Sequence, residues 1–380
     1  MFNLALGFVA SFLVIFFIVR SSGLHGSLSM DHDLHGIQKN HAYAVPRIGG
    51  VGIACAAAIT LVAQPLWATN TGTGNLLLLL CAVPVFAGGI IEDMTKRVSP
   101  RVRLLCALAS ALAACLVMQA TLTRVDLPLV DEWLRIMPIG IGFTMLGVAG
   151  LTNAVNIIDG FNGLASVLTM LIFASIGYVA HSVNDWLVMS MALTMIGAIG
   201  GFVFWNFPVP SVFLGDGGAY FVGFIMAELL ILLIVRNPSV SAWYGMAVAI
   251  YPAFETLFSI YRRRIVRGRP AGDPDGLHLH TLVYRRIVRK GLDAGNLRQR
   301  ALRNSCTSVY LWVLSLVSIV PATFCWGSPA ALAGATVAFV VLYVWLYVAI
   351  VRAKTPRWLM ITGHAPVVAP RPRGAERPRN

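Results

Sequence analysis

Three aspartates stand in glycine-rich turns beside long apolar stretches of this 380-residue chain. Asp93 ends Gly-Gly-Ile-Ile-Glu-Asp, Asp159 lies within Asn-Ile-Ile-Asp-Gly-Phe-Asn-Gly, and Asp216 lies within Phe-Leu-Gly-Asp-Gly-Gly. A carboxylate next to hydrocarbon is costly unless a cation, a polar partner or water compensates its charge. Three such carboxylates on one face of a membrane protein predict a site for a divalent cation and a phosphorylated substrate.

The segment between Asn153 and Gly163 carries the densest set of polar groups between two apolar stretches. It contains Asn153, Asn156, Asp159 and Asn162. Amides supply hydrogen-bond donors and acceptors, and a carboxylate can bind Mg²⁺ or accept from a ring N–H. Capping of the next helix by Asn162 is the alternative, but capping alone leaves the other three side chains unexplained. We therefore expect this segment to contact a ligand, with Asp159 meeting a metal ion or a ring N–H.

Asp216 stands between glycines at the expected start of a helix. Mg²⁺ prefers oxygen ligands and usually shares its shell with phosphates, while exposed N–H groups at a helix start favour an anion. We predict Asp216 as a metal ligand; an ordinary N-cap is the alternative. Phe213, three residues earlier, is a candidate stacking platform for a base, although an interfacial aromatic explains it equally well.

An acidic pair, Glu92 and Asp93, ends the third apolar stretch and precedes four basic residues at positions 96, 97, 101 and 103. Paired carboxylates can hold a metal or accept a proton. A salt-bridged loop explains the same residues about as well.

The long basic segment 262–304 contains His278 and His280 after a cluster of arginines. Arg and His together suit a polyanionic diphosphate, whereas most of the arginines are better explained by anionic lipid headgroups. Residues two apart share one face only in extended chain, so we expect a loop site for the two histidines. Glu255 is expected to pair with the arginine cluster, and Lys39 in the first loop could reach a phosphate.

The composition predicts the elements that must position these residues. Hydrophobic residues make up 57% of the chain and charged residues 12%, whereas a soluble domain carries about 25% charged residues. The predicted fold class is therefore all-α, a polytopic integral membrane protein embedded in the lipid bilayer. About 20 apolar residues cross a bilayer, and eleven spans are expected, at 2–19, 48–67, 74–91, 104–122, 136–152, 164–180, 187–207, 219–235, 243–261, 306–325 and 331–351.

Positive charge predicts the orientation of these spans. If they alternate, 26 of the 29 Lys and Arg residues fall on one side, and only Arg124, Arg135 and Arg236 on the other. By the positive-inside rule the N-terminus lies outside and the C-terminus is cytoplasmic. The net charge of +13 thus indicates orientation in a membrane and no nucleic-acid partner. We expect one catalytic transmembrane domain, 1–351, with a disordered basic tail, 352–380, and cytoplasmic loops at 20–47, 92–103, 153–163, 208–218 and 262–304.

Taken together, and in this order, the motifs resemble those of the polyprenyl-phosphate N-acetylhexosamine-1-phosphate transferases, of the bacterial glycosyltransferase 4 type. The resemblance runs from about residue 31 to 282 and covers Asp33, Lys39 and His41, Pro46 with Gly49 and Gly50, Glu92 and Asp93, Asn153, Asn156, Asp159 and Gly160, Asn206, Phe213 and Asp216, and His278 and His280.

This resemblance implies transfer of an N-acetylhexosamine-1-phosphate from a UDP-sugar to polyprenyl (undecaprenyl) phosphate, with release of UMP. It implies Mg²⁺ as cofactor, with Mn²⁺ as an alternative, and a bacterial inner membrane with the active site on the cytoplasmic face. The reaction would initiate a cell-envelope polysaccharide such as O-antigen. The implied catalytic residues are Asp93, Asp159, Asp216, His278 and His280; the implied substrate-binding residues are Lys39, Glu92, Asn153, Asn156, Asn162, Asn206 and Phe213.

Three positions depart from the family pattern. Glu92 and Asn162 stand where aspartates are usual, and Thr281 stands where a third histidine often does. The absence of three consecutive histidines favours the N-acetylglucosamine-1-phosphate branch over the peptidoglycan enzyme. The sugar and the oligomeric state, a homodimer included, are left open.

A membrane transporter is the main alternative, because acids in glycine-interrupted helices also line ion pathways. Transporters usually place such groups at mid-bilayer between repeats, whereas here they gather toward one surface and no repeat is visible. A scaffold protein of the cell envelope would account for the basic tail but not for the Asn/Asp loops.

Overall fold

The computed structural model describes residues 1–23, 45–67, 72–268, 276–288 and 297–352. Within these ranges the chain is helical and has no β-strand, which confirms the predicted all-α class. The helices are α1 (Phe2–Arg20), α3 (Gly49–Ala63), η1 (Gln64–Leu66), α4 (Gly72–Cys81), α5 (Val83–Thr95), α6 (Pro100–Val117), α7 (Pro128–Leu134), α8 (Met137–Ile158), α9 (Leu164–Ser182), α10 (Trp186–Asn206), α11 (Gly215–Arg236), α12 (Trp243–Val248), α13 (Ile250–Tyr261), η2 (Arg262–Val266), α14 (Leu279–Arg286), α15 (Leu297–Phe324) and α16 (Pro329–Val351).

Among the described residues, nine helices are long and apolar enough to cross a membrane. The bent pair α4–α5, with an angle of 45° between its halves, makes ten if it is one span. The predicted span 243–261 forms two shorter helices, α12 and α13, on either side of Ala249. The chain is thus a multi-pass membrane protein, while the count of eleven and the orientation of the termini stay predictions.

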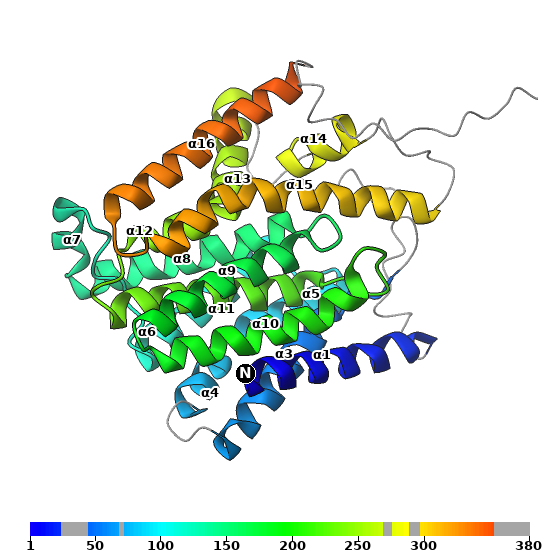
Figure 1. Cartoon of the computed structure of the whole chain (residues 1–380), viewed down its shortest axis with the longest axis horizontal. Coiled ribbons are helices and arrows are strands. Elements are labelled where there is room, and N and C mark those ends of the chain that lie inside the picture. The colour runs from blue at the N-terminus through cyan, green and yellow to red at the C-terminus, as the bar shows by residue number, and fades with distance from the viewer. Residues whose placement is uncertain (24–44, 68–71, 269–275, 289–296, 353–380) are drawn as a thin grey trace, which may run out of the picture.

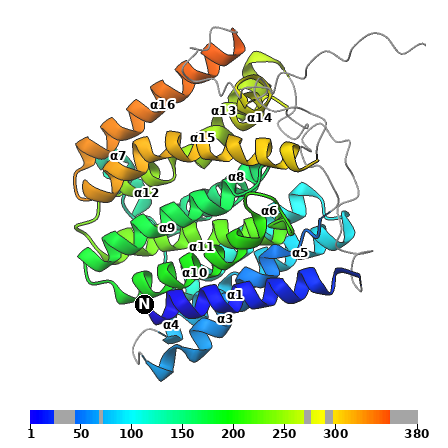
Figure 2. The same ribbon diagram turned by 45° about the vertical axis from the view of Figure 1, so that its right-hand side comes forward.

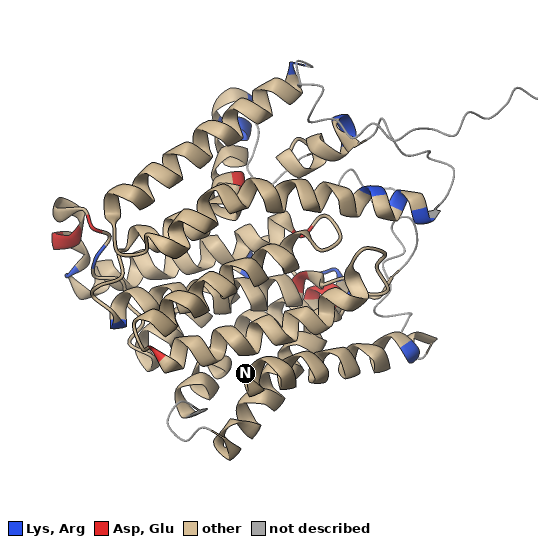
Figure 3. Cartoon of the chain, in the orientation of Figure 1, with Lys and Arg blue, Asp and Glu red and all other residues tan. Residues whose placement is uncertain are grey.

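The outer helices present apolar side chains to the surroundings of the protein. Phe17 on α1, Leu116 on α6, Val313 on α15 and Val337 on α16 are each at least 60% exposed. Such surfaces suit hydrocarbon and would be unfavourable in water. Figure 3 shows that Lys and Arg gather mainly at one end of the bundle, where α1, α14, α15 and α16 reach their ends.

Helix α11 is the centre of the bundle and is buried along almost its whole length. It is apolar on all sides, as expected of a helix enclosed by other helices, and it packs against α3, α5, α8, α9 and α10 (Figures 1 and 2). Its first turn contains Gly217 and Gly218, which permit unusually close neighbours. A Cβ on Gly50 of α3 would lie 2.2 Å from the Cα of Gly218, and one on Gly89 of α5 would lie 2.5 Å from the Cα of Gly217. Three helices therefore meet backbone to backbone at the start of α11.

The last helices form a separate layer on this centre. Helix α15 packs on α9, and α16 packs on α12, α13, α14 and α15. Figure 1 shows α16 (orange) crossing α13 at the outer side of the bundle. This layer holds the segment that contains the two predicted histidines.

Candidate active site

Asp93 at the end of α5 caps the N-terminus of α11. Its Oδ1 accepts from the backbone N–H of Asp216 at 2.9 Å, and its Oδ2 accepts from that of Gly217 at 2.8 Å. Two of the helix-start amides that lack a partner within the helix are thereby satisfied. Gly215 precedes them with φ +77°, and a Cβ there would lie 2.1 Å from the carbonyl oxygen of Arg47. Only glycine fits this turn, so Asp93 and Gly215 together fix where Asp216 stands.

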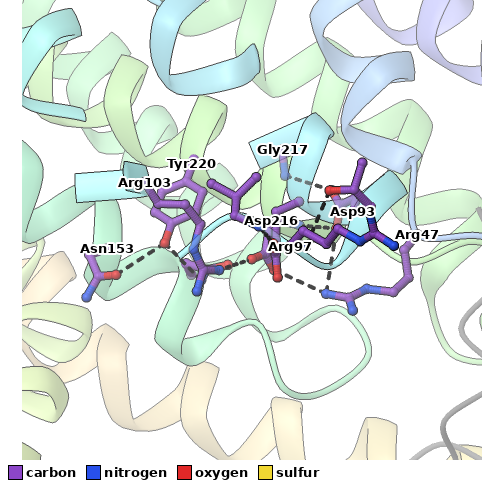
Figure 4. Close-up of polar contacts among 12 residues, drawn as sticks. Arg47, Asp93, Arg97, Arg103, Asn153, Asp216, Gly217 and Tyr220 are labelled. Atoms are coloured by element: carbon purple, nitrogen blue, oxygen red, sulfur yellow. Dashed lines mark hydrogen bonds and ion pairs between the residues drawn. The ribbon is translucent and has the colours of Figure 1, made fainter. Parts of the chain in front are cut away.

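The carboxylate of Asp216 is held between two arginines (Figure 4). The Nη2 atom of Arg47 lies 3.1 Å from Oδ1, and Nη1 of Arg103 donates to Oδ2. Arg47 also approaches Oδ1 of Asp93 at 3.6 Å. Arg47 comes from the turn before α3 and Arg103 from the first turn of α6, so the site combines two acids and two guanidinium groups from four different segments.

Tyr220, one turn after Asp216 on α11, connects this cluster to the asparagine-rich segment. Its hydroxyl donates to Oδ1 of Asn153 and accepts from Nδ2 of Asn156, both at 3.4 Å. The guanidinium carbon of Arg103 lies 6.0 Å from the centre of the tyrosine ring, within the range of a cation–π contact. Asn153 and Asn156 therefore contact a residue one turn away from the predicted metal ligand Asp216.

Asp159 follows the last residue of α8 and interacts electrostatically with the same cluster. Burial raises the pKa of Asp159 to about 7, Arg47 opposes the increase, and the charges of Asp216 and Asp93 add to it. The charges of Asp216 and Asp93 therefore act on the protonation of Asp159.

The two histidines lie beside the Asp159 loop. Their rings stack with centroids 5.1 Å apart, and the ring of His280 lies 5.4 Å from that of Phe161. His278 precedes the first residue of α14, whereas His280 lies within that helix. The prediction that both histidines lie in a loop is therefore wrong for His280. The backbone is extended only at His278, which directly precedes α14, and the two rings stack at the start of this helix.

Two predicted substrate-binding asparagines make contacts that anchor loops. Asn162 donates from its backbone N–H to Oδ1 of Asn304 at 2.7 Å and from Nδ2 to Oγ of Ser305 at 3.3 Å, both on α15. Asn206 accepts from the backbone N–H of Gly163 at 2.7 Å and donates to the carbonyl of residue 212 at 2.9 Å. Their substrate-binding roles stay predictions.

The remaining predicted residues are less closely tied to the cluster. The Oε2 atom of Glu92 accepts a hydrogen bond from the backbone N–H of Val98 at 2.7 Å. This bond closes the turn after α5. Phe213 is half-buried, and its backbone pairs with Pro46 and Gly49. Lys39 lies outside the described residues.

The segment that contains the three predicted aspartates is similar to known proteins. The model of a family described as glycosyl transferase family 4 matches residues 75–234. That range includes Asp93, which caps the start of α11, Asp216 in the first turn of α11, and Asp159 after α8. Residues 75–234 are thus similar to this family.

Curated relatives agree with the family match. A Bacillus subtilis (strain 168) protein named probable undecaprenyl-phosphate N-acetylglucosaminyl 1-phosphate transferase is 29% identical over 247 residues, 64% of this chain and 66% of that protein. A Thermotoga maritima undecaprenyl-phosphate alpha-N-acetylglucosaminyl 1-phosphate transferase is 26% identical over 275 residues, 72% of this chain and 80% of that protein. A Gluconacetobacter diazotrophicus phospho-N-acetylmuramoyl-pentapeptide-transferase is 31% identical over 208 residues, covering 47% of this chain and 56% of that protein. The match thus spans just under two thirds of the Bacillus relative's length.

Four residues that contact the predicted site residues were not themselves predicted as site residues: Arg47, Arg103, Tyr220 and Glu255. Tyr220 was detectable, because residues four apart share a helix face with Asp216. The arginines carry no comparable signal among so many basic residues. Glu255 does not pair with the arginine cluster as expected; it bonds to His278 instead, at 2.9 Å.

The resemblance to this family implies a divalent metal, and the oxygen donors of Asp216 and Asp159 are of the type that Mg²⁺ binds. In the part of the chain that the structure describes, no three His, Cys, Asp or Glu side chains are grouped to hold an ion by themselves. Both oxygens of Asp216 are engaged by arginines, whose charge occupies the place of a cation. The donor set therefore fits an ion that completes its shell with phosphate and water, provided that an arginine turns away from Asp216.

Proposed function

We propose that this protein transfers an N-acetylhexosamine-1-phosphate from a UDP-sugar to polyprenyl phosphate and releases UMP. The observation that carries the proposal is the meeting of Asp216 with two arginines at the glycine-rich start of α11. Two anionic substrates must approach each other in this reaction, and a cluster of compensated acids and guanidinium groups can bind both. The names of the curated relatives support the same activity.

The bond changes define what the residues must do. An oxygen of the polyprenyl phosphate attacks the β-phosphorus of the UDP-sugar, and the bond from that phosphorus to the oxygen of UMP breaks. Arg47 and Arg103 are placed to take up the negative charge of the diphosphate when they leave Asp216, because guanidinium groups bind phosphate through paired hydrogen bonds. His278 and His280 would compensate charge on the side of the Asp159 loop.

We propose Mg²⁺, or Mn²⁺, as the cofactor, with Asp216 and Asp159 as the residues that hold it. When bound, such an ion neutralises the donor diphosphate and lowers the energy of the leaving UMP. Asp93 has both oxygens on the first amides of α11, so we assign it the role of positioning Asp216. A general base is of secondary importance for the attacking polyprenyl phosphate, because a phosphate monoester is already largely ionised near neutral pH.

We further propose that the site faces the cytoplasm in the bacterial inner membrane and that the product initiates a cell-envelope polysaccharide. The concentration of Lys and Arg at one end of the bundle supports this orientation (Figure 3). Nucleotide sugars are polar, so the donor would reach the site from the cytoplasm and not through the bilayer.

The test uses the purified full chain with UDP-N-acetylglucosamine, undecaprenyl phosphate and Mg²⁺. The wild type should release UMP, and Asp216→Asn should lower the rate by at least about a hundredfold. Glu132→Gln, the same type of change at an exposed position on α7, is the control and should behave as the wild type does. Coupled uptake of a solute into proteoliposomes without any lipid-linked product would support the transporter alternative instead.

A further inference from the structure

The buried carboxylate of Glu255 on α13 joins two parts of the chain far apart in sequence. Its Oε1 lies 2.9 Å from Nδ1 of His278 and accepts from the backbone N–H of Leu279 at 3.1 Å. Its Oε2 accepts from the hydroxyl of Tyr343 on α16 at 2.8 Å. Glu255, His278 and Tyr343 are 1%, 5% and 0% exposed, so solvent does not compete for these bonds.

The three donors determine what the carboxylate does to the histidine. An ionised carboxylate only accepts hydrogen bonds, so Nδ1 of His278 must be the donor. The ring then meets any substrate through its other nitrogen, Nε2. A carboxylate behind an imidazole fixes both the tautomer and the orientation of the ring, which is its role in catalytic dyads and metal sites. The hydroxyl of Tyr343 in turn holds the carboxylate in place.

Helix α16 is bonded to the histidine segment at two further points. Nη1 of Arg262 donates to the hydroxyl of Tyr347 and to the carbonyl of Leu277, both at 2.7 Å. Nη1 of Arg286, at the end of α14, donates to the carbonyl of Ile350 at 2.6 Å. The contacts at Tyr343, Tyr347 and Ile350 recur at successive turns of α16, so one face of this helix supports the whole segment from the end of α13 to α14.

We propose that Tyr343 of α16 is a positioning residue for the transfer reaction: through Glu255 it orients His278 toward the donor diphosphate. The inference rests on the proposed function and adds to it a residue from the C-terminal helix, beyond the family match at 75–234. Helix α16 is then part of the catalytic unit as well as a membrane span.

The test compares Tyr343→Phe with the wild type in two measurements. The first is the turnover of UDP-N-acetylglucosamine with undecaprenyl phosphate. The second is the ¹⁵N spectrum of protein labelled in its histidine rings, with the His278 signals assigned from the spectrum of His278→Gln. Loss of one hydrogen bond to a charged group corresponds to about a tenfold change. We expect kcat to fall by about that factor while KM for the UDP-sugar stays within about twofold, and the Nδ1 signal of His278 to move.

Tyr178→Phe, which removes a half-exposed hydroxyl on α9, is the matched control and should change neither measurement. Glu255→Asp shortens the same arm and should reproduce both effects if Tyr343→Phe does not fold. Wild-type kcat in a folded Tyr343→Phe protein would overturn the inference, as would a fall in kcat with an unmoved His278 signal. A wild type that releases no UMP would instead refute the proposed function, and the spectrum would still decide whether Tyr343 orients His278.

Discussion

Arg47 and Arg103 share the single carboxylate of Asp216, and this pairing sets the charge of the site before any substrate arrives. Arginine suits the position because its planar group can exchange a carboxylate for a phosphate without changing its own charge. The same two side chains therefore compensate the charge of Asp216 and can also bind a diphosphate.

Replacing Arg103 by Gln tests this exchange. The variant loses a charge-assisted contact to the donor, so kcat/KM for the UDP-sugar should fall by about tenfold to a hundredfold. Arg101→Gln changes an exposed arginine of the same helix and serves as the control. Equal kinetics for the two variants would show that Arg103 does not contact the donor.

Asp159 gives the site a pH-dependent stability. Its pKa is about 7 in the folded protein, from burial first, against 3.8 for an ordinary aspartate. Between these values the folded protein binds the proton more tightly than the unfolded chain does, so stability is lost as the pH rises from about 4 to 7. Without divalent cations, Asp159→Asn should raise the melting temperature more at pH 8 than at pH 5. An equal increase at both pH values would contradict the assignment.

Helix contacts decide how closely these residues can meet. The start of α11 is crowded by α3 and α5 because glycines face glycines at both contacts. The short distances between helix backbones let Arg47, before α3, and Asp93, at the end of α5, reach the same turn.

Gly50→Ala tests this packing. The added Cβ would lie 2.2 Å from the Cα and 2.3 Å from the backbone N of Gly218, so α3 and α11 must move apart. Overpacking of this kind costs about 1–3 kcal/mol, and the displaced α11 should lose activity as well. Gly147→Ala on α8 adds a methyl group into open space and should lower neither stability nor turnover. Full activity of Gly50→Ala would mean that the close approach is not needed for the site.

At the scale of the whole molecule, apolar runs and charge distribution were enough to predict an all-α membrane protein and most of its helices. The motifs around Asp159 and Asp216 also predicted segments that do meet in space. Short polar loops between spans are confined to the ends of the helices at one surface of the membrane, so they lie near one another. Contacts between distant residues were not predictable: the sequence does not reveal that Asp93 caps α11, or that Tyr343 holds Glu255 from 88 residues away. The break at Ala249 was missed although it has a local signal: Pro252 has no N–H to donate to the carbonyl of Val248, where α12 ends.

The most direct test of the account follows the β-phosphorus of the donor. With UDP-N-acetylglucosamine labelled with ³²P at the β-phosphate, undecaprenyl phosphate and Mg²⁺, the wild type should move the label into the organic-solvent extract as a diphospho-sugar lipid, and Asp216→Asn should not. Label that stays in water-soluble products, or that enters the lipid equally well with Asp216→Asn, would contradict sugar-1-phosphate transfer at the start of α11.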